Sequence, residues 1–172
     1  QCSYVLEGSI FVAGAVIQWL RDQMGFIDES ADTAKMATSV ADNGGVYFIP
    51  SFTGLGAPYW NPDVRGAIFG LTRDSTKAHI VRAALEAQAY QTRDLLSAFE
   101  QDAGQAVTEM RVDGGMVAND FAMQFLADIM GLNVDIPVCH ETTALGAGYL
   151  AMMGQGIVRS LDDISSQRKS AQ

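Results

Sequence analysis

Two adjacent glycines and an asparagine form the first candidate binding feature. In RVDGGMVANDFAMQFLADIMG (residues 111–131), Gly114 and Gly115 follow a short apolar segment, and Asn119 precedes an amphipathic helical pattern. Glycine lets a flat group approach the backbone, and an asparagine amide both donates and accepts. At the carboxyl end of a strand, these residues suit a purine edge or the first phosphate of a nucleotide. A tight turn with Asn119 as helix N-cap is the alternative. From this motif alone we favour the turn, because Gly-Gly is common and lacks the spacing of GxGxxG or GxxxxGK(S/T).

Gly14 and Gln18 form a second candidate. Ser9 is a possible cap for a helix over IFVAGAVIQWLRDQM, which would end at Gly25. Glycine inside a helix costs about 1 kcal/mol relative to alanine, so a specific reason for Gly14 is expected. Four positions apart, Gly14 and Gln18 share one helix face. That face is either a ligand face or a close helix–helix contact with Gln18 at the surface. Without other information, we favour the contact.

The loop SFTGLGAPYWNPDVRG (residues 51–66) is unusually aromatic. Tyr59 and Trp60 stand between Pro58 and Pro62, which indicates a rigid, packed excursion. It either faces a partner or folds back on its own core, and the sequence favours neither.

Residues suited to catalysis are few. His79 and His140 are the only histidines and have no metal-ligand spacing, so no metal site is predicted. No Ser-His-Asp or Cys-His order is present. Asp113 and Glu141 are the carboxylates considered for proton transfer, but nothing singles out either one. We assign no catalytic residue.

The bulk properties exclude several classes. The net charge of −9 argues against nucleic acid or an anionic membrane as partner. No apolar run approaches a membrane span, and no secretory signal is recognisable. Cys2 and Cys139 are predicted to be reduced thiols. A cytoplasmic protein is expected.

Strand and helix patterns alternate, which predicts the α/β class. Residues 45–52 and 66–71 are joined by a loop rather than a crossover helix, so a mixed sheet flanked by helices is expected. The remaining strands are predicted at 4–8, 109–113 and 133–138. Helices are predicted at 10–24, 30–41, 75–103, 119–130 and 142–154, with one more starting at Ser160 and a frayed end.

Several stretches together resemble one family. YVLEGSIFVAGAVIQWLRD, GVYFIPSFTGLGAPYWNPDVRGAIFGLTR, AYQTRDLL, RVDGGMVANDFAMQFLADIMG and ETTALGAGYLAMMGQG are similar to the C-terminal portion of glycerol kinases, within the FGGY carbohydrate kinases. They cover about residues 4–157. The resemblance implies a ribonuclease H-like, actin-like ATPase fold with nucleotide and polyol in a cleft between two domains.

The resemblance also implies a site and its ligands. Gly115 and Asn119 would contact the ADP part of the nucleotide, and Gly14 and Gln18 would line the opposite side of the same pocket. The intact protein would phosphorylate glycerol to glycerol 3-phosphate with ATP and Mg²⁺. The Mg²⁺ ligands and the catalytic aspartate of the family do not match any residue of this chain.

Residues 1–172 are therefore expected to be an incomplete C-terminal domain without its opening strands. We expect this part alone to be inactive, and its bare sheet edge to favour self-association into a homo-oligomer. Two alternatives stay open. One is a non-catalytic nucleotide-binding or assembly module, and the other is a kinase for a different polyol.

Overall fold

The computed structural model describes residues 5–166 and 170–171. The chain divides into two compact units. One runs to Val107 and includes Asn119–Gly131, and the other comprises Thr108–Ala118 and the chain from Leu132 onward. Each unit is described by itself.

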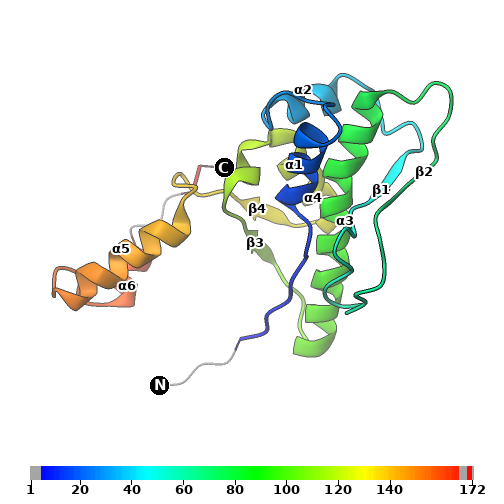
Figure 1. The fold of residues 1–172 in the computed structure, drawn as a ribbon. Coiled ribbons are helices and arrows are strands. Elements are labelled where there is room, and N and C mark those ends of the chain that lie inside the picture. Colours follow the sequence, from blue (N-terminus) through cyan, green and yellow to red (C-terminus); the bar gives the residue numbers. More distant parts are fainter. Residues whose placement is uncertain (1–4, 167–169, 172) are drawn as a thin grey trace. The chain divides into compact units, whose positions relative to one another are not determined.

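The first unit is built around one long helix, α3 (Lys77–Ala103). α1, α2, α4 and the strand β1 all contact α3 (Figure 1). The other elements of this unit are α1 (Gly14–Asp22), α2 (Asp32–Thr38), β1 (Tyr47–Ile49), β2 (Ala67–Phe69) and α4 (Asp120–Met130).

Local chemistry defines both ends of α3. The backbone N–H of Thr76 donates to Nδ1 of His79 at 3.1 Å, as part of a capping box at the N-terminus. Gly104 adopts the left-handed conformation (φ 67°) that ends the helix. Small side chains let neighbouring elements approach α3 closely. The residues buried on it are Val81, Ala83, Ala84, Leu85, Glu86, Ala87, Ala89 and Leu96.

The core of this unit is aliphatic and aromatic. Leu20 and Val16 of α1 are fully buried, as are Val46 before β1 and Leu85 of α3. β1 and β2 pair antiparallel, with Phe48 opposite Ile68.

The second unit contains a parallel strand pair. β3 (Glu109–Arg111) and β4 (Asn133–Asp135) pair with Met110 opposite Val134. A short 3-10 helix, η1, spans Gly115–Ala118. α5 (Thr142–Gly154) and α6 (Leu161–Ser165) follow β4 in the chain.

Most predicted elements are confirmed, but the N-terminal segment is not. The first helix begins at Gly14 instead of residue 10, and Ser9 caps no helix. The carbonyl of Ser9 accepts from the N–H of Ala57, in the aromatic loop of residues 51–66, at 3.1 Å. The Ser9 carbonyl is therefore bonded to this loop and does not accept the first hydrogen bond of a helix. Residues 5–8 form no strand, and Tyr4 of that predicted strand lies outside the described residues. Both kinds of strand pairing predicted for the sheet occur, in two separate two-stranded sheets.

The aromatic loop folds back on its own unit. Leu55 and Asn61 exchange backbone hydrogen bonds of 2.8 and 3.0 Å, and the ring of Trp60 meets Phe11 edge-on. Tyr59 and Trp60 nevertheless stay 57% and 63% exposed. In the described part of the chain, no helix is long and apolar enough to cross a membrane.

Candidate nucleotide site

The Gly-Gly turn lies at the carboxyl edge of the parallel pair in the second unit. Gly114, just after β3, has φ +83° and donates its N–H to the carbonyl of His140, which follows β4, at 3.2 Å. Gly115 then begins η1, and its φ is not positive. The turn therefore requires glycine conformationally only at Gly114. At Gly115 an added Cβ would meet no heavy atom within 4 Å among the described residues, so packing does not require glycine there.

Asp113 has a structural partner in the same unit. The Thr142 hydroxyl donates to the Asp113 carboxylate. This bond links the end of β3 to the first residue of α5. Asp113, one of the two carboxylates considered for proton transfer, therefore holds the segment after β4 against the Gly-Gly turn.

Asn119 lies in the first unit, where it is buried and is the N-cap of α4. Its Oδ1 accepts from the N–H of Ala122 at 3.0 Å. Its Nδ2 donates to the Thr33 hydroxyl of α2, also at 3.0 Å. The N-cap interpretation of Asn119 is thus confirmed. It does not exclude a ligand contact, because an amide has two N–H donors and two acceptor lone pairs, and these bonds use one of each.

Gly14 and Gln18 lie on α1 of the first unit. Gly14 is the first helical residue, so the expected position inside a helix was wrong. A Cβ on Gly14 would meet no heavy atom within 4 Å among the described residues. The close helix–helix contact favoured from sequence is therefore not found at Gly14. Gln18 is exposed, while Val16 and Leu20 face the core.

Three of the four predicted site residues thus share one unit. α1, which carries Gly14 and Gln18, and α4, which Asn119 caps, both pack on α3. Gly115 belongs to the second unit.

The residues present fit a nucleotide in chemical type. Gly14 and Gly115 leave open space where a flat ring or a phosphate could approach, and Gln18 and Asn119 carry amides that match a base edge or a hydroxyl. Within residues 5–166 and 170–171, no group of three or more His, Cys, Asp or Glu side chains could hold a metal ion.

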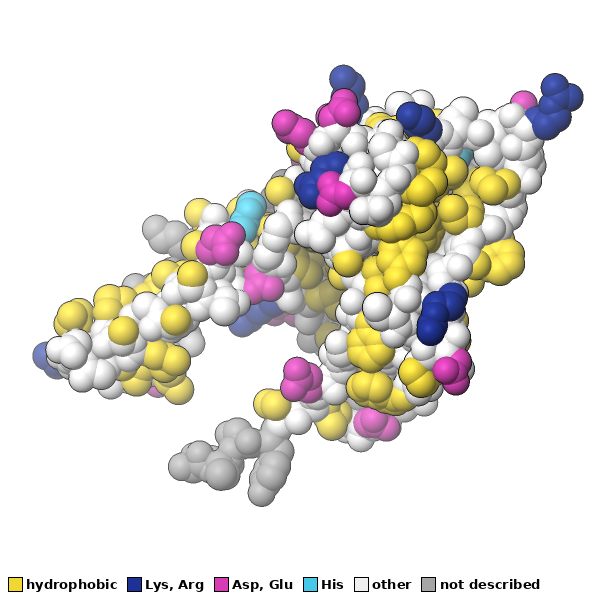
Figure 2. Space-filling view, viewed as in Figure 1, with side chains coloured by type: hydrophobic (Ala, Val, Ile, Leu, Met, Phe, Trp, Pro, Cys, Tyr) yellow, Lys and Arg dark blue, Asp and Glu magenta, His cyan; other side chains and the backbone are white. Residues whose placement is uncertain are grey.

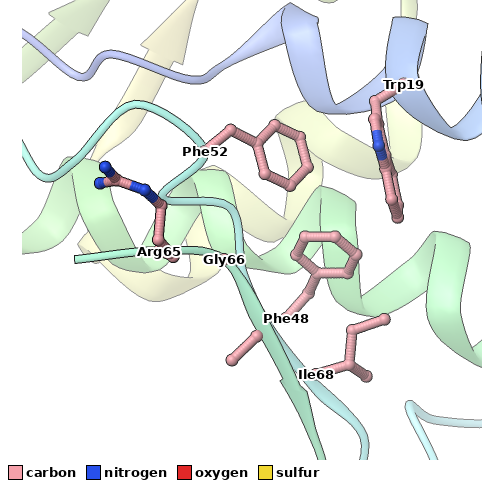
Figure 3. A pocket seen from close by; sticks show the side chains of 7 residues that line it. Trp19, Phe48, Phe52, Arg65, Gly66 and Ile68 are labelled. Atoms are coloured by element: carbon pink, nitrogen blue, oxygen red, sulfur yellow. The ribbon is translucent and has the colours of Figure 1, made fainter. Parts of the chain in front are cut away.

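A separate hollow of about 690 Å³ in the first unit was not anticipated from sequence (Figure 3). Trp19, Phe48 and Phe52 form its aromatic wall, with ring centroids 5.1 to 6.2 Å apart. Arg65 also lines it, but its Nη1 donates to the carbonyls of Pro62 and Val64 at 2.7 and 2.8 Å. With its one charged side chain bonded to its own loop, the hollow offers little to orient a polar ligand.

The comparisons with known proteins identify the chain as part of a carbohydrate kinase. The chain matches the model of the FGGY family of carbohydrate kinases, C-terminal domain, over residues 1–155, and it belongs to that family. It is 58% identical over 167 residues to the glycerol kinase of Rhodospirillum rubrum, covering 97% of this chain and 34% of that protein. The chain thus spans about a third of the length of such relatives.

Solved structures agree with this assignment. The Plasmodium falciparum glycerol kinase with ADP superposes with a TM-score of 0.76 at 34% identity, over 89% of this chain and 30% of that one. A ligand-bound xylulose kinase from Lactobacillus acidophilus reaches a TM-score of 0.79 at 24% identity, over 96% of this chain and 34% of that one, which shows a shared fold.

Proposed function

We propose that this chain is the nucleotide-binding C-terminal part of an ATP-dependent glycerol kinase, which transfers a phosphoryl group from ATP to glycerol and yields ADP and glycerol 3-phosphate. The observation that carries the proposal is the 58% identity to a glycerol kinase along nearly the whole chain. The likeness to a glycerol kinase solved with ADP supports it. Phosphoryl transfer depends mainly on positioning and charge neutralisation, which a binding domain can serve without a reacting group.

The proposed nucleotide contacts are Gly14, Gln18, Gly115 and Asn119. Support comes from the open space at both glycines and from the two amides. The Mg²⁺ that accompanies ATP would be held by residues outside this chain.

We further propose that residues 1–172 are an incomplete domain that does not turn over substrate alone, and that the intact protein is a cytoplasmic homo-oligomer. α5 is apolar but buries no residue, although a helix that is apolar all round is normally covered. Hydrophobic side chains also gather on the face shown in Figure 2. On the paired strands β1 and β2, Tyr47 and Phe69 are 52% and 56% exposed. These exposed apolar surfaces support the proposed homo-oligomer.

A coupled assay of the full-length protein tests the function. ATP-dependent turnover with glycerol, and much weaker turnover with xylulose, is the expected result. Equal or better turnover with xylulose would favour a kinase for a substrate other than glycerol. ADP binding without turnover on either substrate would favour a non-catalytic nucleotide-binding module. If the protein showed no ADP binding and no turnover, the proposal would be refuted altogether.

A further inference from the structure

Thr33 is a buried threonine that no sequence pattern connects with the nucleotide site. It lies in the first turn of α2, and its side chain is 1% exposed. Its hydroxyl donates to the carbonyl of Ser30 at 2.6 Å and accepts from Nδ2 of Asn119 at 3.0 Å. A polar side chain buried this completely is satisfied by these two bonds.

The bonding partners of the Thr33 hydroxyl fix its proton. A carbonyl can only accept, so the single hydroxyl proton points to Ser30. Toward Asn119 the Thr33 oxygen can then only accept, and it must face the NH₂ end of the amide. The N–H of Ala122 can only donate, so the other end of the same amide must be its oxygen. These two independent constraints assign the same orientation to the Asn119 amide.

α2 is itself held firmly, so Thr33 is a rigid support. Nη1 of Arg82 on α3 donates to the carbonyls of Ala37, Val40 and Ala41, at 3.3, 2.8 and 3.1 Å. α2 also packs against α3 and α4. Movement of Thr33 would therefore disturb contacts well beyond its own turn.

We propose that Thr33 is a positioning residue for nucleotide binding, acting through Asn119. Its hydroxyl holds the Asn119 amide in one orientation. The remaining N–H and lone pair of the amide are therefore already oriented for the nucleotide before it binds. This inference rests on the proposed nucleotide role of Asn119. Preorganisation of this kind strengthens binding by removing the cost of ordering the side chain.

The test compares Thr33→Val, Thr33→Ser, Asn119→Leu and wild type in the full-length protein. Valine keeps the shape of threonine and removes the hydroxyl, while serine keeps the hydroxyl. Thr38→Val is the matched control, because Thr38 is on the same helix and its hydroxyl, among the described residues, donates to the carbonyls of Ala34 and Lys35 in that helix. The readouts are ADP dissociation constant by calorimetry, KM for ATP and for glycerol, kcat, and melting temperature.

We expect Thr33→Val to weaken ADP binding and raise the KM for ATP about five- to tenfold, with kcat and the KM for glycerol unchanged. Thr33→Ser should restore both values, and Thr38→Val should match wild type. If the Thr33–Asn119 hydrogen bond were only structural, Thr33→Val would instead lower the melting temperature and change kcat and the KM values for both substrates together. That pattern would overturn the proposal.

The remaining outcomes separate this inference from the proposed function. If Thr33→Val bound ADP normally while Asn119→Leu bound it weakly, only the role of Thr33 would be refuted. Normal binding by both variants would remove Asn119 from the site, and the role of Thr33 with it. Absence of ADP binding by the wild-type protein would refute the proposed function itself.

Discussion

Nε of Arg82 lies 2.8 Å from Oε1 of Glu86, one turn further along α3, and the two side chains are only 16% and 4% exposed. The other carboxylate oxygen of Glu86 accepts from Nδ2 of Asn43 at 2.8 Å. The Arg82 guanidinium also lies over the ring of Phe121, 5.0 Å from its centroid. One ion pair thus joins α3 to the segment after α2 and to α4.

We expect Arg82→Met to lower the free energy of unfolding by about 3 kcal/mol, because it leaves the Glu86 carboxylate buried without its cation. Chemical denaturation of the purified protein measures the change. Arg21→Met is the control, since Arg21 pairs with Asp22 at 2.7 Å on the exposed surface, where such pairs contribute little. Equal losses in the two variants would mean that the Arg82 pair is no more important than a surface pair.

The two glycines of the Gly-Gly turn should respond differently to substitution. Gly114→Ala should lower the free energy of unfolding by about 1–2 kcal/mol, because alanine is strained at positive φ. Gly115→Val should leave stability nearly unchanged, since an added Cβ there meets no described atom within 4 Å. It should nevertheless raise the KM for ATP, because the nucleotide is the neighbour proposed for that space.

Denaturation midpoints and steady-state kinetics of both variants in the full-length protein check this division. If Gly115→Val retained the wild-type KM for ATP, the second glycine would belong to an ordinary turn and not to a binding site.

Local patterns were sufficient to predict most elements. The end of α3 at Gly104 and the limits of α4, between Asn119 and Gly131, follow from caps that act within a few residues of the helix. The alternation of strand and helix patterns predicted the α/β class. By contrast, the position of Gly14 was misjudged because the carbonyl of Ser9 bonds to Ala57, which is distant in sequence.

The hydrogen bond between Thr33 and Asn119 at the candidate site could not be predicted from local sequence patterns either. Thr33 and Asn119 are 86 positions apart, and neither lies in a motif that includes the other. A threonine in a short amphipathic helix has many ordinary explanations, so only the tertiary structure singles it out. The nucleotide roles of Gly14, Gln18, Gly115 and Asn119 remain predictions that binding experiments must test.

Tyr59 provides a pH-dependent prediction. Its phenol donates to the Asp94 carboxylate at 2.8 Å, and this hydrogen bond, with smaller contributions from burial and the negative charge, raises the pKa of Tyr59. The folded state therefore favours the protonated phenol. This stabilisation is complete below the ordinary tyrosine pKa of about 10 and is lost as the pH rises through the higher folded pKa.

Asp94→Asn should move the Tyr59 pKa back down toward its usual range. Absorbance titration of tyrosine ionisation measures the shift, and Tyr59→Phe identifies which transition belongs to Tyr59. An Asp94→Asn titration identical to wild type would show that the hydrogen bond does not persist in solution.

The exposed amide of Gln18 allows a test of the α1 side of the proposed site. Gln18→Ala should raise the KM for ATP several-fold, because a lost ligand hydrogen bond costs about 1 kcal/mol. It should leave stability and the KM for glycerol unchanged, since Gln18 lies outside the core. Gln23→Ala is the matched control, because Gln23 is an exposed glutamine at the C-cap of α1, five residues beyond Gln18. If the two alanine variants had the same KM for ATP, the face of α1 that carries Gly14 and Gln18 would not contact the nucleotide.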